Sequence, residues 1–177
     1  MDAPESTPPG SIYWAAVEPV WNTIDIYNGE ERFLATFASC NRDRALLCTA
    51  HWSQSEICNG GFTQFFHNDT GVLAPEAVDA FNAIGMPRAA REIEIAMELL
   101  GLRFIRDRAV RMGQIESILN QEDEQRHGAP KKYGSFRYVE GWAPAQATFY
   151  ECLANENRGF NQAADAFALS RKLNKSR

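Results

Sequence analysis

Apolar residues recur three or four positions apart along almost the whole chain, which is the spacing of one buried face of a helix. Residues 87–100 show this most clearly, with apolar residues on one face at Ala89, Ile93, Ala96 and Leu100. Alternation with a period of two, which is typical of strands, is nearly absent. The pattern therefore predicts an all-α fold, with about seven or eight helices in a single globular domain.

Capping residues and turn residues divide this pattern into elements. Asn41 and Asp107 each precede an apolar-periodic stretch, where a side-chain oxygen can cap the first turn of a helix. Residues 128–144 hold three glycines, two prolines and four aromatic residues, which predicts a long loop or a short hairpin that packs its aromatic side chains.

The ends of the chain differ from its middle in composition. The first residues are rich in Pro and Ser, and the last ones are basic. We expect a disordered N-terminal tail over residues 1–11, a helical domain over residues 12–170 and a basic C-terminal tail over residues 171–177.

The bulk composition is that of an ordinary globular protein, with 177 residues, of which 45% are hydrophobic and 23% charged. No apolar run approaches the roughly 20 residues that cross a bilayer. The start of the chain has neither the basic segment nor the apolar core of a secretory signal. These features predict a cytoplasmic protein with no membrane partner.

The acidic excess is concentrated in two segments. Residues 1–31 carry six acidic residues and no Lys or Arg, and residues 113–126 carry four acidic residues and one Arg. Residues 86–112, in contrast, have a net charge of +2. With a total charge of −5, direct binding to nucleic acid is not expected. The candidate acidic surface consists of Glu18, Asp25, Glu30, Glu31, Glu122, Asp123 and Glu124.

The titratable side chains form no recognised catalytic or metal-binding motif. The three histidines, His51, His67 and His127, show neither His-x-x-x-His nor His-Glu-x-x-His spacing. The nucleophile motif Gly-x-Ser-x-Gly does not occur. The four cysteines form no Cys-x-x-Cys pair and are expected to be reduced, buried thiols: Cys40, Cys48, Cys58 and Cys152. The sequence thus predicts no metal, no cofactor and no enzymatic activity.

The most distinctive stretch, residues 59–68, reads NGGFTQFFHN. Its two adjacent glycines, Gly60 and Gly61, give the backbone the freedom to end one helix and begin another. The three phenylalanines that follow recur at i, i+3 and i+4, the spacing of a buried helical face: Phe62, Phe65 and Phe66.

Polar side chains surround this glycine pair. The amides of Asn59, Gln64 and Asn68 are expected to satisfy backbone groups left open where helices end. Glu56, one turn before the glycines, is expected to accept hydrogen bonds from the start of the following helix. A pocket for a polar ligand is the alternative role for these amides.

The pattern NGGFxQFFxN, preceded by Glu56 and followed by Gly71, resembles a bacterial family of unknown-function domains. That family includes a DNA-mimic protein, which binds a helix-turn-helix repressor in place of DNA. The resemblance covers about residues 41–101. It implies a non-enzymatic protein-binding module, whose acidic surface would meet the Lys and Arg side chains of a DNA-binding protein. A homodimer would double the charge of −5 to −10.

Two other functions remain open. An interaction protein or immunity-type protein would bind through an apolar or mixed patch, anchored by Trp14, Trp21 and Trp142. A small-molecule-binding protein would need Glu56, Gln64 and His67 to converge in a concave site. Salt would weaken binding through the acidic surface and would leave binding through the apolar patch largely unchanged.

Overall fold

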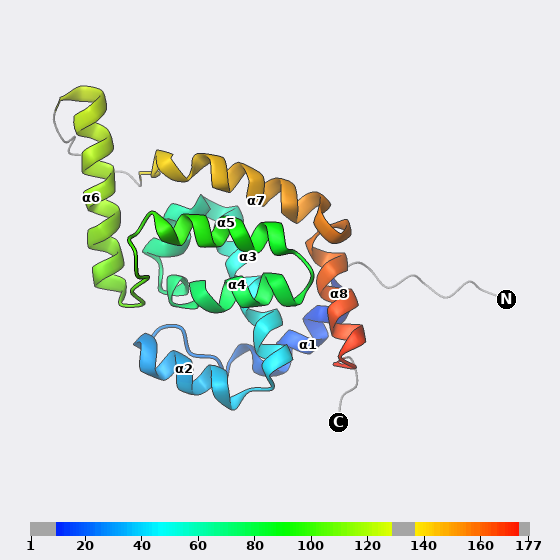
Figure 1. Ribbon diagram of the computed structural model, residues 1–177. Helices are drawn as coiled ribbons and strands as arrows, with labels where there is room; N and C mark the ends of the chain where they lie inside the picture. Colours follow the sequence, from blue (N-terminus) through cyan, green and yellow to red (C-terminus); the bar gives the residue numbers. More distant parts are fainter. Residues whose placement is uncertain (1–9, 129–136, 174–177) are drawn as a thin grey trace.

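Helix α3 (Arg42–His67) runs through the middle of the fold, and helices α1, α4, α6, α7 and α8 all contact it (Figure 1). The computed structural model describes residues 10–128 and 137–173. The other helices are α1 (Ser11–Trp21), α2 (Gly29–Ser39), α4 (Ala74–Ala83), α5 (Pro87–Glu98), α6 (Arg108–His127), α7 (Ala143–Asn155) and α8 (Phe160–Ser170). Three short 3₁₀ helices connect them: η1 (Asp69–Leu73), η2 (Glu140–Trp142) and η3 (Glu156–Arg158).

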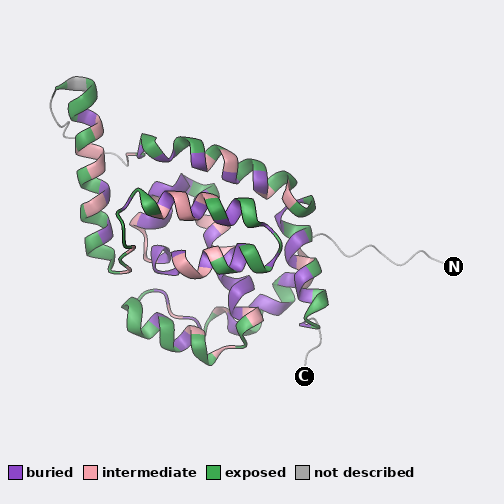
Figure 2. Cartoon of the chain, viewed as in Figure 1, coloured by how far each residue is buried: buried purple, intermediate pink, exposed green. Residues whose placement is uncertain are grey.

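The described residues form eight α-helices and no strand, so the prediction of an all-α domain is confirmed. Its core follows the helical spacing of the apolar residues. Phe62, Phe65 and Phe66 are completely buried, and the Phe66 ring lies 5.2 Å from the Trp142 ring between centroids. Figure 2 shows the buried positions on the sides of the helices that face one another, where burial of each large apolar side chain contributes about 1.5–3 kcal/mol.

The helix starts agree with the capping residues. The side chain of Asn41 accepts the Arg44 N–H at 3.1 Å, and that of Asp107 accepts the Val110 N–H at 2.9 Å. Each bond satisfies one of the N–H groups that a helix leaves without a partner in its first turn.

The predicted aromatic loop near residues 128–144 lies partly on residues 129–136, outside the described residues. After them the chain runs through residues 137–139 into η2, and Ala143 begins α7. The predicted tails also lie largely outside the described part, at residues 1–9 and 174–177.

Candidate protein-binding surface

The diglycine corner bends α3 without ending it. Gly60 has φ −157° and ψ 25°, whereas Gly61 has φ 69° and ψ −174°, a conformation that only glycine adopts readily. Helix α7 approaches closely here: the Gln146 side chain accepts the Phe62 N–H at 3.2 Å. A Cβ on Gly61 would lie 2.0 Å from the same Gln146 oxygen. Both the backbone angles of Gly61 and the close approach of Gln146 therefore require glycine at this position.

A carboxylate and two amides connect the two halves of α3 across this corner. Oε2 of Glu56 accepts hydrogen bonds from Nδ2 of Asn68 at 2.8 Å and from Nε2 of Gln64 at 3.4 Å. The expectation that these amides satisfy open backbone groups is wrong for Gln64 and Asn68, and Glu56 accepts side-chain rather than backbone N–H groups. The bend brings side chains 8 and 12 residues apart within reach of one carboxylate. Asn59 is exposed.

Gln64→Ala is expected to lower the free energy of unfolding by about 0.5–1.5 kcal/mol, because it removes one hydrogen bond to Glu56. It is not expected to change partner binding, since Gln64 is half-buried beside the corner. Urea denaturation measures the loss, and Asn59→Ala, an exposed amide in the same motif, is the control. Wild-type stability combined with lost binding would refute this role.

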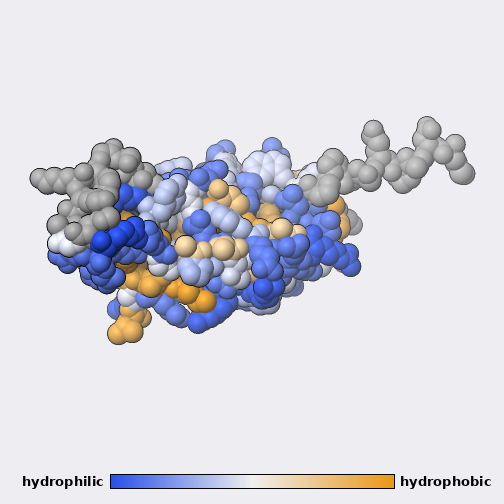
Figure 3. Space-filling model, turned by 90° about the horizontal axis from the view of Figure 1, so that it is seen from above, coloured by the Kyte–Doolittle hydropathy of each residue, from blue (hydrophilic) through white to orange (hydrophobic). Residues whose placement is uncertain are grey.

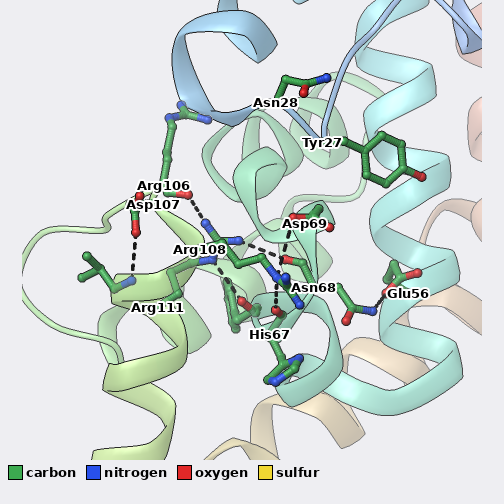
Figure 4. A network of polar contacts seen from close by, with 12 residues as sticks. Tyr27, Asn28, Glu56, His67, Asn68, Asp69, Arg106, Asp107, Arg108 and Arg111 are labelled. Carbon is green, nitrogen blue, oxygen red and sulfur yellow. Dashed lines mark hydrogen bonds and ion pairs between the residues drawn. The ribbon is translucent and has the colours of Figure 1, made fainter.

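Arg111, near the start of α6, is a buried cation without an ion pair to a described carboxylate. Its guanidinium donates to the carbonyl oxygens of Phe66 at 3.0 Å and Asn68 at 2.9 Å, and also to that of Arg106 (Figure 4). The first two carbonyls lie at the C-terminal end of α3, where the helix dipole favours a positive charge. Burial lowers the pKa of Arg111 to about 10, and the nearby Asp107 partly offsets this effect. Arg111 therefore fixes α6 to α3.

Arg106 joins the same corner to α2 and α4. It donates to both carboxylate oxygens of Glu76, at 2.6 and 2.8 Å, and its Nε lies 3.4 Å from Glu30 at the start of α2. Arg108 similarly lies 3.6 Å from Asp69. These arginines face carboxylates of the same chain, so part of the basic charge of residues 86–112 is neutralised locally.

Helix α6 and the start of α2 lie along one edge of the molecule (left in Figure 1), and the Arg106–Glu30 contact joins them. The acidic residues of this edge, here called the acidic edge, are Glu30, Glu31, Glu116, Glu122 and Glu124. Seen from above in Figure 3, most of the visible surface is hydrophilic, and hydrophobic residues gather in only a few places. From residue 108 to residue 124, α6 rises about 24 Å.

Four of the seven acidic residues predicted from the sequence have partners within the molecule, and one of them is Glu30, which pairs with Arg106. Asp25 accepts the N–H groups of Tyr27 and Asn28, at 3.0 and 3.2 Å. Buried Asp123 pairs with Arg137. Glu122 accepts the backbone N–H groups of residues 140 and 141, at 3.1 and 3.0 Å, and so caps η2.

Glu30 and the three acidic residues without an ion pair to a described residue are exposed. Glu31 and Glu124 form no ion pair with a described residue, while Glu30 shares Arg106. Glu18 is exposed on α1, away from α6 (Figure 1). Glu116, also exposed on α6, was left out of the predicted surface. Its place in the acidic segment of residues 113–126 was the signal that could have included it.

The family model described as DMP19-like protein matches residues 38–171, which run from the end of α2 to the end of α8. The chain belongs to the DMP19-like family. This confirms the predicted family, which is one of DNA-mimic proteins. Comparison with curated proteins gave no significant match, and comparison with solved structures gave none.

The structure of this DMP19-like protein bears on the two other functions, binding through an aromatic patch and binding of a small molecule. Trp142 is buried and donates its indole N–H to the Ala96 carbonyl at 2.9 Å, so its proposed role as a surface anchor is wrong. Trp14 is 40% exposed and stays available. His67 lines a cavity of about 500 Å³ with Glu116 and Arg137, but neither Glu56 nor Gln64 lines it.

Other chemistry is limited within the described part of this DMP19-like protein. No group of three or more His, Cys, Asp or Glu side chains there is arranged to hold a metal ion. None of the described helices is both long and apolar enough to cross a membrane. The cysteines are free, but Cys58 is exposed and Cys40 half-buried, so the expectation of four buried thiols is wrong for these two. Cys58 lines a cavity together with Tyr150 and Phe160.

Proposed function

We propose that this protein is a non-enzymatic DNA mimic, whose acidic edge occupies the DNA-binding surface of a helix-turn-helix transcription regulator. The observation that carries the proposal is the set of exposed carboxylates on α6 and α2, on a chain of the DMP19-like family. In this role the carboxylates replace phosphates and meet the Lys and Arg side chains that would otherwise contact DNA.

The number of carboxylates limits the size of the contact. A duplex carries about one phosphate per 1.7 Å of axis, so about 24 Å of DNA presents roughly 14 charges. The acidic edge presents five carboxylates, of which Glu30 and Glu122 are partly engaged. It therefore suits a small basic cluster, such as the recognition helix of one half-site, rather than a long stretch of the regulator.

The fold supports this role mechanically. Arg111 and Arg106 fix the start of α6 to the body of the protein, and Asp123 ties its far half to Arg137. A rigid helix keeps its carboxylates in place before the partner arrives, which reduces the entropy lost on binding. We place the protein in the bacterial cytoplasm, and a homodimer would present two such edges.

Binding through the acidic edge is expected to weaken steeply with salt. In a pull-down from the native extract, a helix-turn-helix regulator is expected to be retained at about 0.05 M salt and released at about 0.5 M salt. The purified pair is then titrated with operator DNA, which is expected to displace this protein. The double variant Glu31→Gln with Glu124→Gln is expected to lower the affinity about tenfold, as the loss of close charge pairs at an interface predicts.

The matched control is the double variant Glu92→Gln with Glu151→Gln, which removes the same charge from α5 and α7. It is expected to bind as tightly as the wild type. If the captured partner does not bind DNA, or if operator DNA and this protein bind it together, the proposal fails. It also fails if both double variants weaken binding equally, since net charge alone would then explain the effect.

A further inference from the structure

We propose that an aromatic surface on α1 and α3 binds an arginine side chain of a protein partner. This surface, here called the indole patch, consists of Trp14, Glu18, Trp21 and Trp52. It lies apart from the acidic edge, and the inference holds whether or not that edge mimics DNA.

The indole patch is continuous across two helices. Trp14, Glu18 and Trp21 occupy positions i, i+4 and i+7 of α1, which fall on one face of a helix. The rings of Trp14 and Trp21 lie 5.3 Å apart, and those of Trp21 and Trp52 lie 4.6 Å apart, between centroids. Trp14 is 40% exposed, while Trp21 and Trp52 are half-buried. Three indoles thus form one partly accessible surface beside a carboxylate.

His51 on α3 supports the indoles from below. Its ring lies 5.1 Å from that of Trp14 and 5.5 Å from that of Trp21, and its Nδ1 lies 3.0 Å from the Tyr13 hydroxyl. Burial lowers the pKa of His51, so the imidazole is neutral near neutral pH. The support therefore adds no positive charge that would repel a cation resting on the indoles.

Glu18 lies on the same face of α1 as Trp14 and Trp21, and the adjacent turn of this helix holds a second hydrogen-bond acceptor. Glu18 is exposed and forms no ion pair with a described residue. Pro19 lies inside α1 and has no N–H group, so it cannot donate to the Ala15 carbonyl one turn earlier. A carboxylate and a carbonyl without its helical donor are thus adjacent on the outer surface of α1.

This combination selects a guanidinium group. Arginine is planar, stacks on indole rings and donates several hydrogen bonds in its own plane. A neighbouring carboxylate strengthens these bonds by its charge. Glu18 would repel a phosphate or a nucleic acid. A purely apolar partner would bury the Glu18 carboxylate without offering it a hydrogen-bond donor.

The test is a titration followed by the indole N–H signals in NMR spectra. The chain has four tryptophans, so the buried Trp142 serves as an internal control. A short glycine peptide with two arginines is expected to shift the signals of Trp14 and Trp21 and to leave that of Trp142 unchanged. The same peptide with neutral citrulline is expected to bind at least about fivefold more weakly, and with lysine about two- to fivefold more weakly.

Two variants separate the contributions of charge and ring. Glu18→Gln removes the charge, and Trp14→Leu keeps an apolar side chain without a π face. Each is expected to weaken binding of the arginine peptide about two- to fivefold. The Glu151→Gln control on α7 is expected to bind as the wild type does. An unchanged Trp142 signal shows that each variant is folded.

The inference is overturned if the citrulline peptide binds as tightly as the arginine peptide, or if Trp14→Leu binds normally. It is also overturned if a single-stranded thymidine oligonucleotide shifts Trp14 more than the peptide does. The double variant Glu31→Gln with Glu124→Gln is expected to bind the peptide normally. If the wild-type protein does not bind the arginine peptide but still competes with operator DNA for the regulator, the inference about the indole patch is refuted and the proposed function stands.

Discussion

Replacing Arg111 by methionine is expected to lower the free energy of unfolding by about 3 kcal/mol, the largest effect of any single charged side chain here. The substitution removes the Arg111 donor from the carbonyls of Phe66 and Arg106, and it leaves the Asn68 carbonyl with the Gly71 N–H at 3.1 Å. Each buried acceptor without a donor costs about 1–3 kcal/mol. The guanidinium no longer has to be desolvated in the variant, which offsets part of the sum. Denaturation with urea measures the difference.

Two further variants test whether the loss of stability comes from the hydrogen bonds of Arg111 or from its charge. Arg111→Lys keeps the charge but cannot reach three carbonyls at once, so about half of the loss is expected to remain. Arg103→Met removes an exposed arginine before α6 and is expected to change stability by less than about 0.5 kcal/mol. If Arg111→Met unfolds like the wild type, the three carbonyls find other donors and Arg111 does not hold α6 in place.

Gly61→Ala is also expected to destabilise the protein by about 3 kcal/mol. The backbone at φ 69° and ψ −174° is a region that costs a residue with a Cβ about 1–3 kcal/mol. The new Cβ, 2.0 Å from the Gln146 oxygen, also displaces the acceptor of the Phe62 N–H. Loss of that hydrogen bond adds about 1 kcal/mol. Thermal and urea denaturation measure the sum.

The matched control is Gly113→Ala in α6, where the described residues place no atom of another part of the chain within 4 Å of the new Cβ. Alanine there is expected to stabilise the protein by about 0.5–1 kcal/mol, because glycine loses more conformational freedom in a helix. Adding Gln146→Ala to Gly61→Ala relieves the collision and leaves the backbone strain. A Gly61→Ala protein as stable as the wild type would mean that the bend can relax into a regular helix.

Local signals in the sequence predicted much of the fold. Asn41 and Asp107 act through bonds to residues three positions later, and the glycine pair acts through its own dihedral angles. The buried phenylalanines follow from helical spacing. These features depend on neighbours in the chain, which a single sequence displays.

The surface could be predicted only in part, because burial and pairing depend on distant segments. Arginine is rarely buried, and nothing near Arg111 in the sequence indicates the carbonyls 43 and 45 residues away. Asp123 likewise meets Arg137 only through the fold. Composition located the acidic segments but could not tell which carboxylates are already engaged. For the same reason the sequence could not distinguish the buried Trp142 from the exposed Trp14 as a surface anchor.

Gly71, which follows the glycine-phenylalanine motif, owes its place to Arg111. A Cβ at position 71 would lie 2.8 Å from the Nε of that arginine, so the guanidinium rests against a residue that has no side chain. The residues at positions 71 and 111 are therefore expected to covary. Lineages that retain arginine at 111 are expected to retain glycine at 71, and those with a shorter residue at 111 become free to enlarge residue 71. Evolutionary drift at one position should be accompanied by drift at the other, although 40 residues separate them in the chain.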